Sequence, residues 1–144
     1  MPQINAAGLA LIESFEGCEL TAYQDTGGVW TIGFGHTGPH VHEGQTITQT
    51  EADQFLQEDV SEASAEVAKL VEVVLTPNEF SALVSFEYNT GALGSSPGLG
   101  LINSNAFQPA WDDHFCLYTH DANGNTLEGL VRRRAAERAL FFTA

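Results

Sequence analysis

Hydrophobic residues recur at helical spacing near the start of the chain. Leu9, Ile12 and Phe15 form one apolar stripe, and Asn5 is a suitable N-terminal cap for the helix that they predict. Gly17 follows and can adopt the left-handed backbone that ends a helix. The pattern therefore predicts a first helix that ends at about residue 16.

A longer helical pattern begins at a capping box, Thr48-x-x-Glu51. The apolar positions that follow at helical spacing are Phe55, Leu56, Val60, Ala63, Val67, Leu70, Val71 and Val74. They predict a long helix to about Val74. The acidic residues among its polar positions predict a solvated face, and they are Asp53, Glu58, Glu62 and Glu66.

The second half of the chain also reads as helical. Residues 76–79 (TPNE) combine an N-cap, a proline at the first helical position and a glutamate at the third. Residues 107–118 and 127–142 predict two further helices. Residues 95–105 contain two glycines that each cost about 1 kcal/mol in a helix interior, so we expect a short, mobile helix there.

Between the first two helices the pattern changes to that of a hairpin. Residues 20–23 form a short extended run, residues 25–28 (DTGG) supply a turn, and residues 29–34 are rich in strand-forming residues. The polar residues that this arrangement brings close together are Glu16, Asp25 and Thr31.

Length and composition fit one globular domain. The chain has 144 residues, 43% of them hydrophobic, and a mean hydropathy of -0.08. No apolar run approaches the roughly 20 residues that span a bilayer, so we expect no membrane insertion. The first residues carry acidic groups and no basic region, which does not fit a signal peptide.

The net charge of -14 excludes some partners. Only five Lys and Arg residues are present, which argues against nucleic-acid binding. Such a surface would be repelled by an anionic target at low salt. It fits either a high-salt habitat, where ions screen the repulsion, or a less anionic target.

The two cysteines, Cys18 and Cys116, lie far apart in the sequence. A reducing compartment favours free thiols, and a disulfide is the alternative. The histidines His36, His40 and His42 form H-x3-H-x-H, which admits metal binding, but no cysteine accompanies them. We therefore expect ordinary loop histidines and no metal.

Residues 121–125 mimic the start of a calcium-binding loop. Thr126 stands where that loop requires glycine, and Arg132 stands where it requires a bidentate glutamate. We therefore interpret this segment as a turn.

Glu16 and Asp25 are two carboxylic acids in unlike surroundings. Phe15 and the negative end of a helix dipole both disfavour the ionised form of Glu16, which suits an acid. Asp25 lies in a Gly-rich turn, where water and backbone N–H groups keep it charged. Glycoside hydrolysis needs such a pair, and the hydroxyl of Thr31 can help to hold a water.

The spacing of these three residues, followed by TIGFGHTG, resembles the catalytic segment of the phage-type lysozymes (endolysins, glycoside hydrolase family 24). Residues 47–60 (ITQTEADQFLQEDV), 82–91 (ALVSFEYNTG) and 129–141 (GLVRRRAAERALF) also resemble that family, in the same order. The resemblance covers nearly the whole chain.

The resemblance implies an α+β, mainly helical, lysozyme-like fold in a single domain, residues 1–144. It implies a hairpin lobe at about residues 16–47 and a helical lobe at about residues 76–144 that includes the N-terminal helix. A long helix would join the two lobes and form the floor of the cleft between them.

The resemblance also implies an activity. Glu16 would be the general acid, Asp25 the carboxylate base and Thr31 the residue that positions water. The enzyme would hydrolyse the β-1,4 bond between N-acetylmuramic acid and N-acetylglucosamine in bacterial peptidoglycan, with inversion and without metal or cofactor.

Two other functions stay open. One is a related hydrolase of chitin or chitosan, and the other is a lysozyme-fold binding module without catalysis. The presence of all three residues argues against the second, since a non-catalytic module has no physical reason to keep them.

Tyr88 and Asn89 are expected to face the cleft and bind sugar. Core packing is the alternative for Tyr88, and helix capping is the alternative for Asn89. Arg133 or Arg134 is expected either to orient Glu16 or to form ion pairs with the acidic surface.

His36 is expected to pair with Asp59 as part of the architecture. We further expect a monomer whose partner is peptidoglycan. It would stay in the host cytoplasm until a separate pore releases it to the wall.

Overall fold

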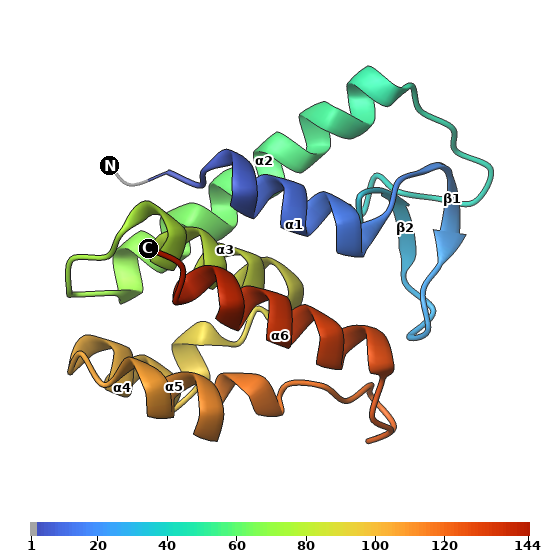
Figure 1. Cartoon of the computed structure of the whole chain (residues 1–144). Helices are drawn as coiled ribbons and strands as arrows, with labels where there is room; N and C mark the ends of the chain where they lie inside the picture. Colours follow the sequence, from blue (N-terminus) through green and yellow to red (C-terminus); the bar gives the residue numbers. More distant parts are fainter. Residues whose placement is uncertain (1–2) are drawn as a thin grey trace.

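The computed structural model describes residues 3–144 and confirms a mainly helical α+β chain (Figure 1). The elements in chain order are α1 (Ala6–Glu16), β1 (Glu19–Gln24), β2 (Trp30–Gly33), α2 (Gln49–Leu70), α3 (Pro77–Thr90), the 3₁₀ turn η1 (Leu93–Ser95), α4 (Gly98–Asn103), α5 (Phe107–Asp113), the 3₁₀ turn η2 (Phe115–Leu117) and α6 (Glu128–Phe141).

The helix α3 is the centre of the molecule. It packs against α1, α2 and α6, and every residue from 80 to 86 is buried. Figure 1 shows the hairpin of β1 and β2 at one end, with α2 running away from it along the molecule. The helices α4 and α5 lie on the far side of α6 from α1.

The helix starts follow the expected caps. Asn5 accepts the Gly8 N–H at the start of α1. Thr48 and Thr76 each form a complete capping box, with Glu51 and Glu79 respectively. Each box satisfies two backbone donors that a helix start otherwise leaves unpaired.

The hairpin has an irregular antiparallel register. Tyr23 pairs with Thr31 and Gln24 with Trp30, and the register shifts between Glu19 and Tyr23. The turn between the strands is closed by Asp25, whose backbone N–H donates to the Val29 carbonyl at 2.9 Å.

The prediction that the long helix reaches Val74 is wrong. α2 ends at Leu70, and Val71 is extended. Asn103 of α4 explains the early end, because its side chain donates to the Leu70 carbonyl at 3.1 Å and accepts the Glu72 N–H at 2.7 Å. A side chain from a distant element thus satisfies groups that another helical turn would have used.

The predicted helix at residues 107–118 is also interrupted. α5 ends at Asp113, and the chain continues as the 3₁₀ turn η2. The centroids of the Phe115 and Phe86 rings lie 4.8 Å apart. The Phe115 ring also packs against Gly98, where a Cβ would lie 2.6 Å from Phe115 Cε1. Gly98, one of the two glycines that weaken α4, therefore leaves the space that the Phe115 ring occupies.

Other local expectations have clear outcomes. The segment at residues 121–125 is a turn in which Asp121 Oδ1 accepts the N–H groups of Asn123 and Asn125, each at 2.9 Å. Cys18 and Cys116, both in the described part of the chain, are free thiols. None of the helices described is long and apolar enough to cross a membrane.

His36 ties the hairpin end to α2. Its Nδ1 lies 2.7 Å from Asp59 Oδ2, so the expected contact is present. Its ring stacks on Phe55 at a centroid distance of 4.2 Å, and its Nε2 lies 2.6 Å from His40 Nε2. His42 takes no part in this cluster and instead faces its neighbour's carbonyl, Glu43 O, at 3.1 Å.

A glycine pair tests the α1–α3 packing. A Cβ on Gly8 would lie 2.6 Å from Ser81 Cβ, whereas a Cβ on Gly100 would meet nothing within 4 Å. Gly8→Ala should lower the free energy of unfolding by about 1–3 kcal/mol through overpacking. Gly100→Ala should raise it by about 0.5–1 kcal/mol. Urea unfolding measures both, and similar changes would contradict the close approach.

A histidine pair tests the tie to α2. His36→Ala should lower the free energy of unfolding by about 2–3 kcal/mol, because it removes the stacking on Phe55 and leaves Asp59 without its partner. His42→Ala, at an exposed loop position, should change it by less than about 0.5 kcal/mol. The measurement is thermal or urea unfolding, and an equal loss in the two variants would refute a structural role for His36.

Candidate active site

Glu16 stands where the hairpin meets the helical part of the molecule. It is the last residue of α1, and the chain leaves the helix through Gly17, whose φ is 65°. The side chain is 19% exposed, and its Oε2 accepts a hydrogen bond from Arg133 Nη1 at 2.6 Å. Arg133 also places its guanidinium carbon 5.9 Å from the centroid of the Phe15 ring.

The other face of Glu16 rests on the backbone of Gly35. A Cβ at Gly35 would lie 2.9 Å from Glu16 Oε1, and the φ of this residue is +85°. Both facts favour glycine, because other residues rarely adopt that backbone and would collide with the carboxylate. Glu16 is thus held between the segment after β2 and the helix α6.

Asp25 lies in the exposed turn of the hairpin. Its Oδ1 accepts the N–H groups of Gly27 and Val29, each at 2.9 Å. The backbone N–H contacts that the sequence predicted for this turn are therefore present.

Thr31 is 4% exposed on β2, and its hydroxyl donates to the Val29 carbonyl at 2.9 Å. The proton of the hydroxyl is therefore engaged within the hairpin, and the oxygen keeps its capacity to accept.

Tyr23 lies close enough to Glu16 and Asp25 for both charges to act on it. Burial raises its pKa, and the negative charges of Glu16, Glu19 and Asp25 raise it further. Its backbone pairs directly with Thr31. The sequence pattern indicated only that Tyr23 was part of an extended run. Its position two residues before Asp25, on the strand that leads into the turn, was the available signal.

Tyr88 joins α3 to the hairpin end. Its hydroxyl donates to the Phe34 carbonyl at 2.6 Å. Burial raises the pKa of Tyr88, the charges of Glu16 and Asp59 raise it further, and Arg133 lowers it. The ring packs against the core and also lines a pocket, while the binding of sugar by Tyr88 stays a prediction.

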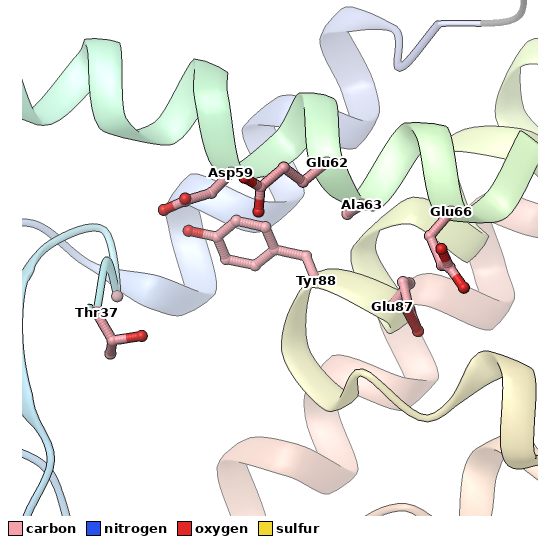
Figure 2. Close-up of a pocket in the computed structure, with 8 residues that line it drawn as sticks. Thr37, Asp59, Glu62, Ala63, Glu66, Glu87 and Tyr88 are labelled. Carbon is pink, nitrogen blue, oxygen red and sulfur yellow. The ribbon is translucent and has the colours of Figure 1, made fainter. Parts of the chain in front are cut away.

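That pocket has a volume of about 370 Å³ and lies between α2, α3 and the segment after β2 (Figure 2). Its lining consists of Gly35, Thr37, Asp59, Glu62, Ala63, Glu66, Glu87 and Tyr88. Figure 2 shows Tyr88 pointing along α2 toward Asp59. Burial raises the pKa of Glu87, while a hydrogen bond from the Leu93 N–H lowers it.

Asn89 lines a different pocket, of about 550 Å³, together with Glu16 and Arg133. The apolar part of its lining comes from Phe15, Leu127 and Leu130. The capping alternative for Asn89 is not needed to end α3, because Gly91 adopts the left-handed conformation and donates its N–H to the Glu87 carbonyl. The end of α3 thus contributes neighbouring residues to both pockets.

The structure separates the roles of the two candidate arginines. Arg133 contacts Glu16, whereas Arg134 pairs with Glu137, with its Nη2 donating to Glu137 Oε2 at 2.9 Å. Arg134 Nη1 also donates to the Tyr118 carbonyl at 3.3 Å. The expectation that one of the two reaches Glu16 therefore applies to Arg133.

Within residues 3–144, no group of three or more His, Cys, Asp and Glu side chains is placed to hold a metal ion. His36 and His40 contact each other and Asp59 instead.

Comparison with known proteins identifies the family. The Phage lysozyme family model matches residues 13–137. The chain is 43% identical to the endolysin of Bacillus phage B103 over 97% of its own length, and spans 54% of that protein. It is 37% identical to the endolysin of Acyrthosiphon pisum secondary endosymbiont phage 1, and the match covers 98% of this chain and 99% of that protein.

The fold comparison agrees. The muramidase domain of SpmX from Asticaccaulis excentricus superposes with a TM-score of 0.89 at 38% identity, over the full length of both chains. The lysozyme-like fold expected from the sequence is confirmed, and the chain belongs to the phage lysozyme family.

Proposed function

We propose that this chain is a muramidase of the endolysin type, which hydrolyses the β-1,4 bond between N-acetylmuramic acid and N-acetylglucosamine in bacterial peptidoglycan. The observation that carries the proposal is the position of Glu16. Glu16 lines a 550 Å³ pocket between the end of α1, the end of α3 and the start of α6, and its carboxyl group lies between Gly35 and Arg133. Membership of the phage lysozyme family supports the reaction class.

Glu16 is the general acid in this mechanism. In its protonated form it donates a proton to the glycosidic oxygen as the bond from that oxygen to the anomeric carbon breaks. The leaving sugar departs as a neutral alcohol, and positive charge develops on the ring that remains. The Glu16 side chain is 19% exposed, and Arg133 Nη1 donates to its Oε2 at 2.6 Å.

Asp25 is the base for the attacking water. Its oxygen accepts one water proton while the water oxygen bonds to the anomeric carbon. Thr31 accepts the second water hydrogen in a hydrogen bond, because its own proton is engaged with the Val29 carbonyl. Attack from the face opposite Glu16 inverts the anomeric configuration, and solvent then restores both carboxyl groups to their starting forms.

Tyr88 and Asn89 bind the glycan in this proposal. The Tyr88 hydroxyl is already bonded to the Phe34 carbonyl, so the ring offers its apolar face to a sugar. Asn89 lies beside Glu16 in the same pocket lining, where its amide suits a hydroxyl or acetamido group. The protein acts on the wall as a monomer.

A carboxamide replacement tests the acid. Glu16→Gln should keep the fold and reduce lysis by about 10²–10⁴-fold, because the amide cannot donate a proton to the leaving oxygen. Loss of turbidity of outer-membrane-permeabilised bacteria gives the rate, and circular dichroism checks the fold. Glu13→Gln, exposed on the same helix, is the matched control and should retain full activity.

The Glu16 test also separates the alternatives. Near-full activity in Glu16→Gln would rule out the assigned acid. Mass analysis of products from defined oligosaccharides distinguishes muramidase cleavage from cleavage of chitin or chitosan. Inversion is checked by the anomeric NMR signal of the first product.

A salt series tests the acidic surface. With a net charge of -14, lysis of an anionic wall should speed up as salt rises from roughly 0.01 M to 0.1 M, because the screening length falls from about 30 Å to about 10 Å. The rate on an uncharged soluble oligosaccharide should stay nearly constant. A lysis rate that falls steadily over this range would show that attraction, not repulsion, controls the approach to the wall.

A further inference from the structure

A buried cluster of charged groups lies behind the Arg133–Glu16 contact. Arg133, Arg134 and Glu137 occupy one part of α6, and their side chains are 3%, 1% and 0% exposed. Ser85 of α3 is also fully buried against them. Neither the sequence pattern nor the proposed mechanism assigns a role to Glu137 or Ser85.

Glu137 accepts three hydrogen bonds, all at one of its two carboxylate oxygens. Its Oε2 accepts hydrogen bonds from Ser85 Oγ at 2.6 Å, from Arg134 Nη2 at 2.9 Å and from Arg133 Nε at 3.3 Å. Its Oε1 lies 2.6 Å from Arg134 Nε. Burial raises the pKa of Glu137, and the charges of the two arginines act in the opposite direction.

Arg133 is held from two sides. On one side its Nη1 donates to Glu16. On the other, its Nε donates to Glu137, and its Nη2 donates to the carbonyl and hydroxyl oxygens of Ser85 at 3.4 and 3.3 Å. A guanidinium fixed at three nitrogens cannot rotate without breaking several buried hydrogen bonds. The direction in which it points at Glu16 is therefore set by Glu137 and Ser85.

The charges of the cluster add up in a way that concerns Glu16. Two guanidiniums and one carboxylate, all buried, leave one positive charge opposite Glu16. Without Glu137 two positive charges would remain. Each would favour the ionised form of Glu16, which cannot serve as an acid.

We propose that Glu137 and Ser85 are positioning residues for the general acid. They orient Arg133 toward Glu16, and Glu137 neutralises part of the positive charge behind that contact. The inference rests on the proposed function, in which Glu16 is the acid. It assigns the two roles separately, because Glu137 supplies charge and orientation, and Ser85 supplies orientation alone.

The two roles give different kinetic signatures. Glu137→Gln should move the alkaline limb of the activity profile to lower pH by roughly one unit, because the unbalanced guanidiniums favour ionised Glu16. Ser85→Ala keeps every charge, so it should lower kcat about 3- to 30-fold with KM and the alkaline limb unchanged. A double variant, Arg134→Gln with Glu137→Gln, restores one net positive charge and should return the limb toward its original position.

The experiment measures kcat and KM on soluble peptidoglycan fragments across pH for these variants, with melting temperatures as a fold check. Asp112→Asn is the matched control. This change breaks the exposed ion pair between Asp112 of α5 and Arg138, which lies on α6 like the buried cluster. Arg138 Nε and Asp112 Oδ1 lie 2.7 Å apart, and the pH profile of activity should stay unchanged. A folded Glu137→Gln protein with an unmoved alkaline limb would overturn the proposal, as would an equal shift in the control.

Two further measurements keep the test decisive. If Glu137→Gln does not fold, Ser85→Ala decides, and an unchanged kcat in that variant refutes the positioning role. A ¹³C NMR titration of the Glu16 carboxyl group, identified by its loss in Glu16→Gln, reads the coupling to Glu137 without any turnover. If Glu137→Gln moves the titration of Glu16 but the parent protein shows no hydrolysis, the proposed function has failed while the coupling between Glu137 and Glu16 stands.

Discussion

The hydrogen-bonded ion pair between Arg133 and Glu16, 2.6 Å long, joins residues that are 117 positions apart. It fixes the end of α1 against α6, and the chain leaves α1 directly for the hairpin that carries Asp25 and Thr31. The placement of the acid relative to the hairpin therefore depends on this contact. Because Arg133 is 3% exposed and also bonded to Glu137, the pair is anchored in the interior and is little screened by salt.

Glycines determine how closely the elements around that pair can approach. Gly8 lets α1 lie on α3, and Gly35 lets the segment after β2 lie on the Glu16 carboxyl group. Gly98 does the same for the Phe115 ring near the base of the helical part. At each of these positions a Cβ would lie 2.6–2.9 Å from its neighbour. The close packing therefore depends on the absence of a side chain at these three glycines.

Part of the small basic content of this chain of net charge -14 is buried. Two of its five basic residues, Arg133 and Arg134, are buried, and their partners are Glu16 and Glu137. The surface is correspondingly acidic, and part of that acidity, at Asp59, Glu62, Glu66 and Glu87, lines the pocket in Figure 2. The group that contacts Glu16 in the interior is thus positively charged, whereas the net charge of the chain is negative.

The sequence by itself determined the helix starts, the hairpin, the turns at Asp25 and Asp121, and the residues proposed for catalysis, because each depends on groups a few positions apart or on a motif read as a unit. The tertiary structure decided where α2 ends, because Asn103 bonds the Leu70 carbonyl. It also decided where α5 ends, because the Phe115 ring packs against Gly98. It also decided that Arg133, not Arg134, faces Glu16, and it brought Tyr23, Ser85 and Glu137 into the account. Adjacent residues on a helix point about 100° apart, so the choice between the two arginines belongs to the packing of α6 on α1 and α3, which no local pattern encodes.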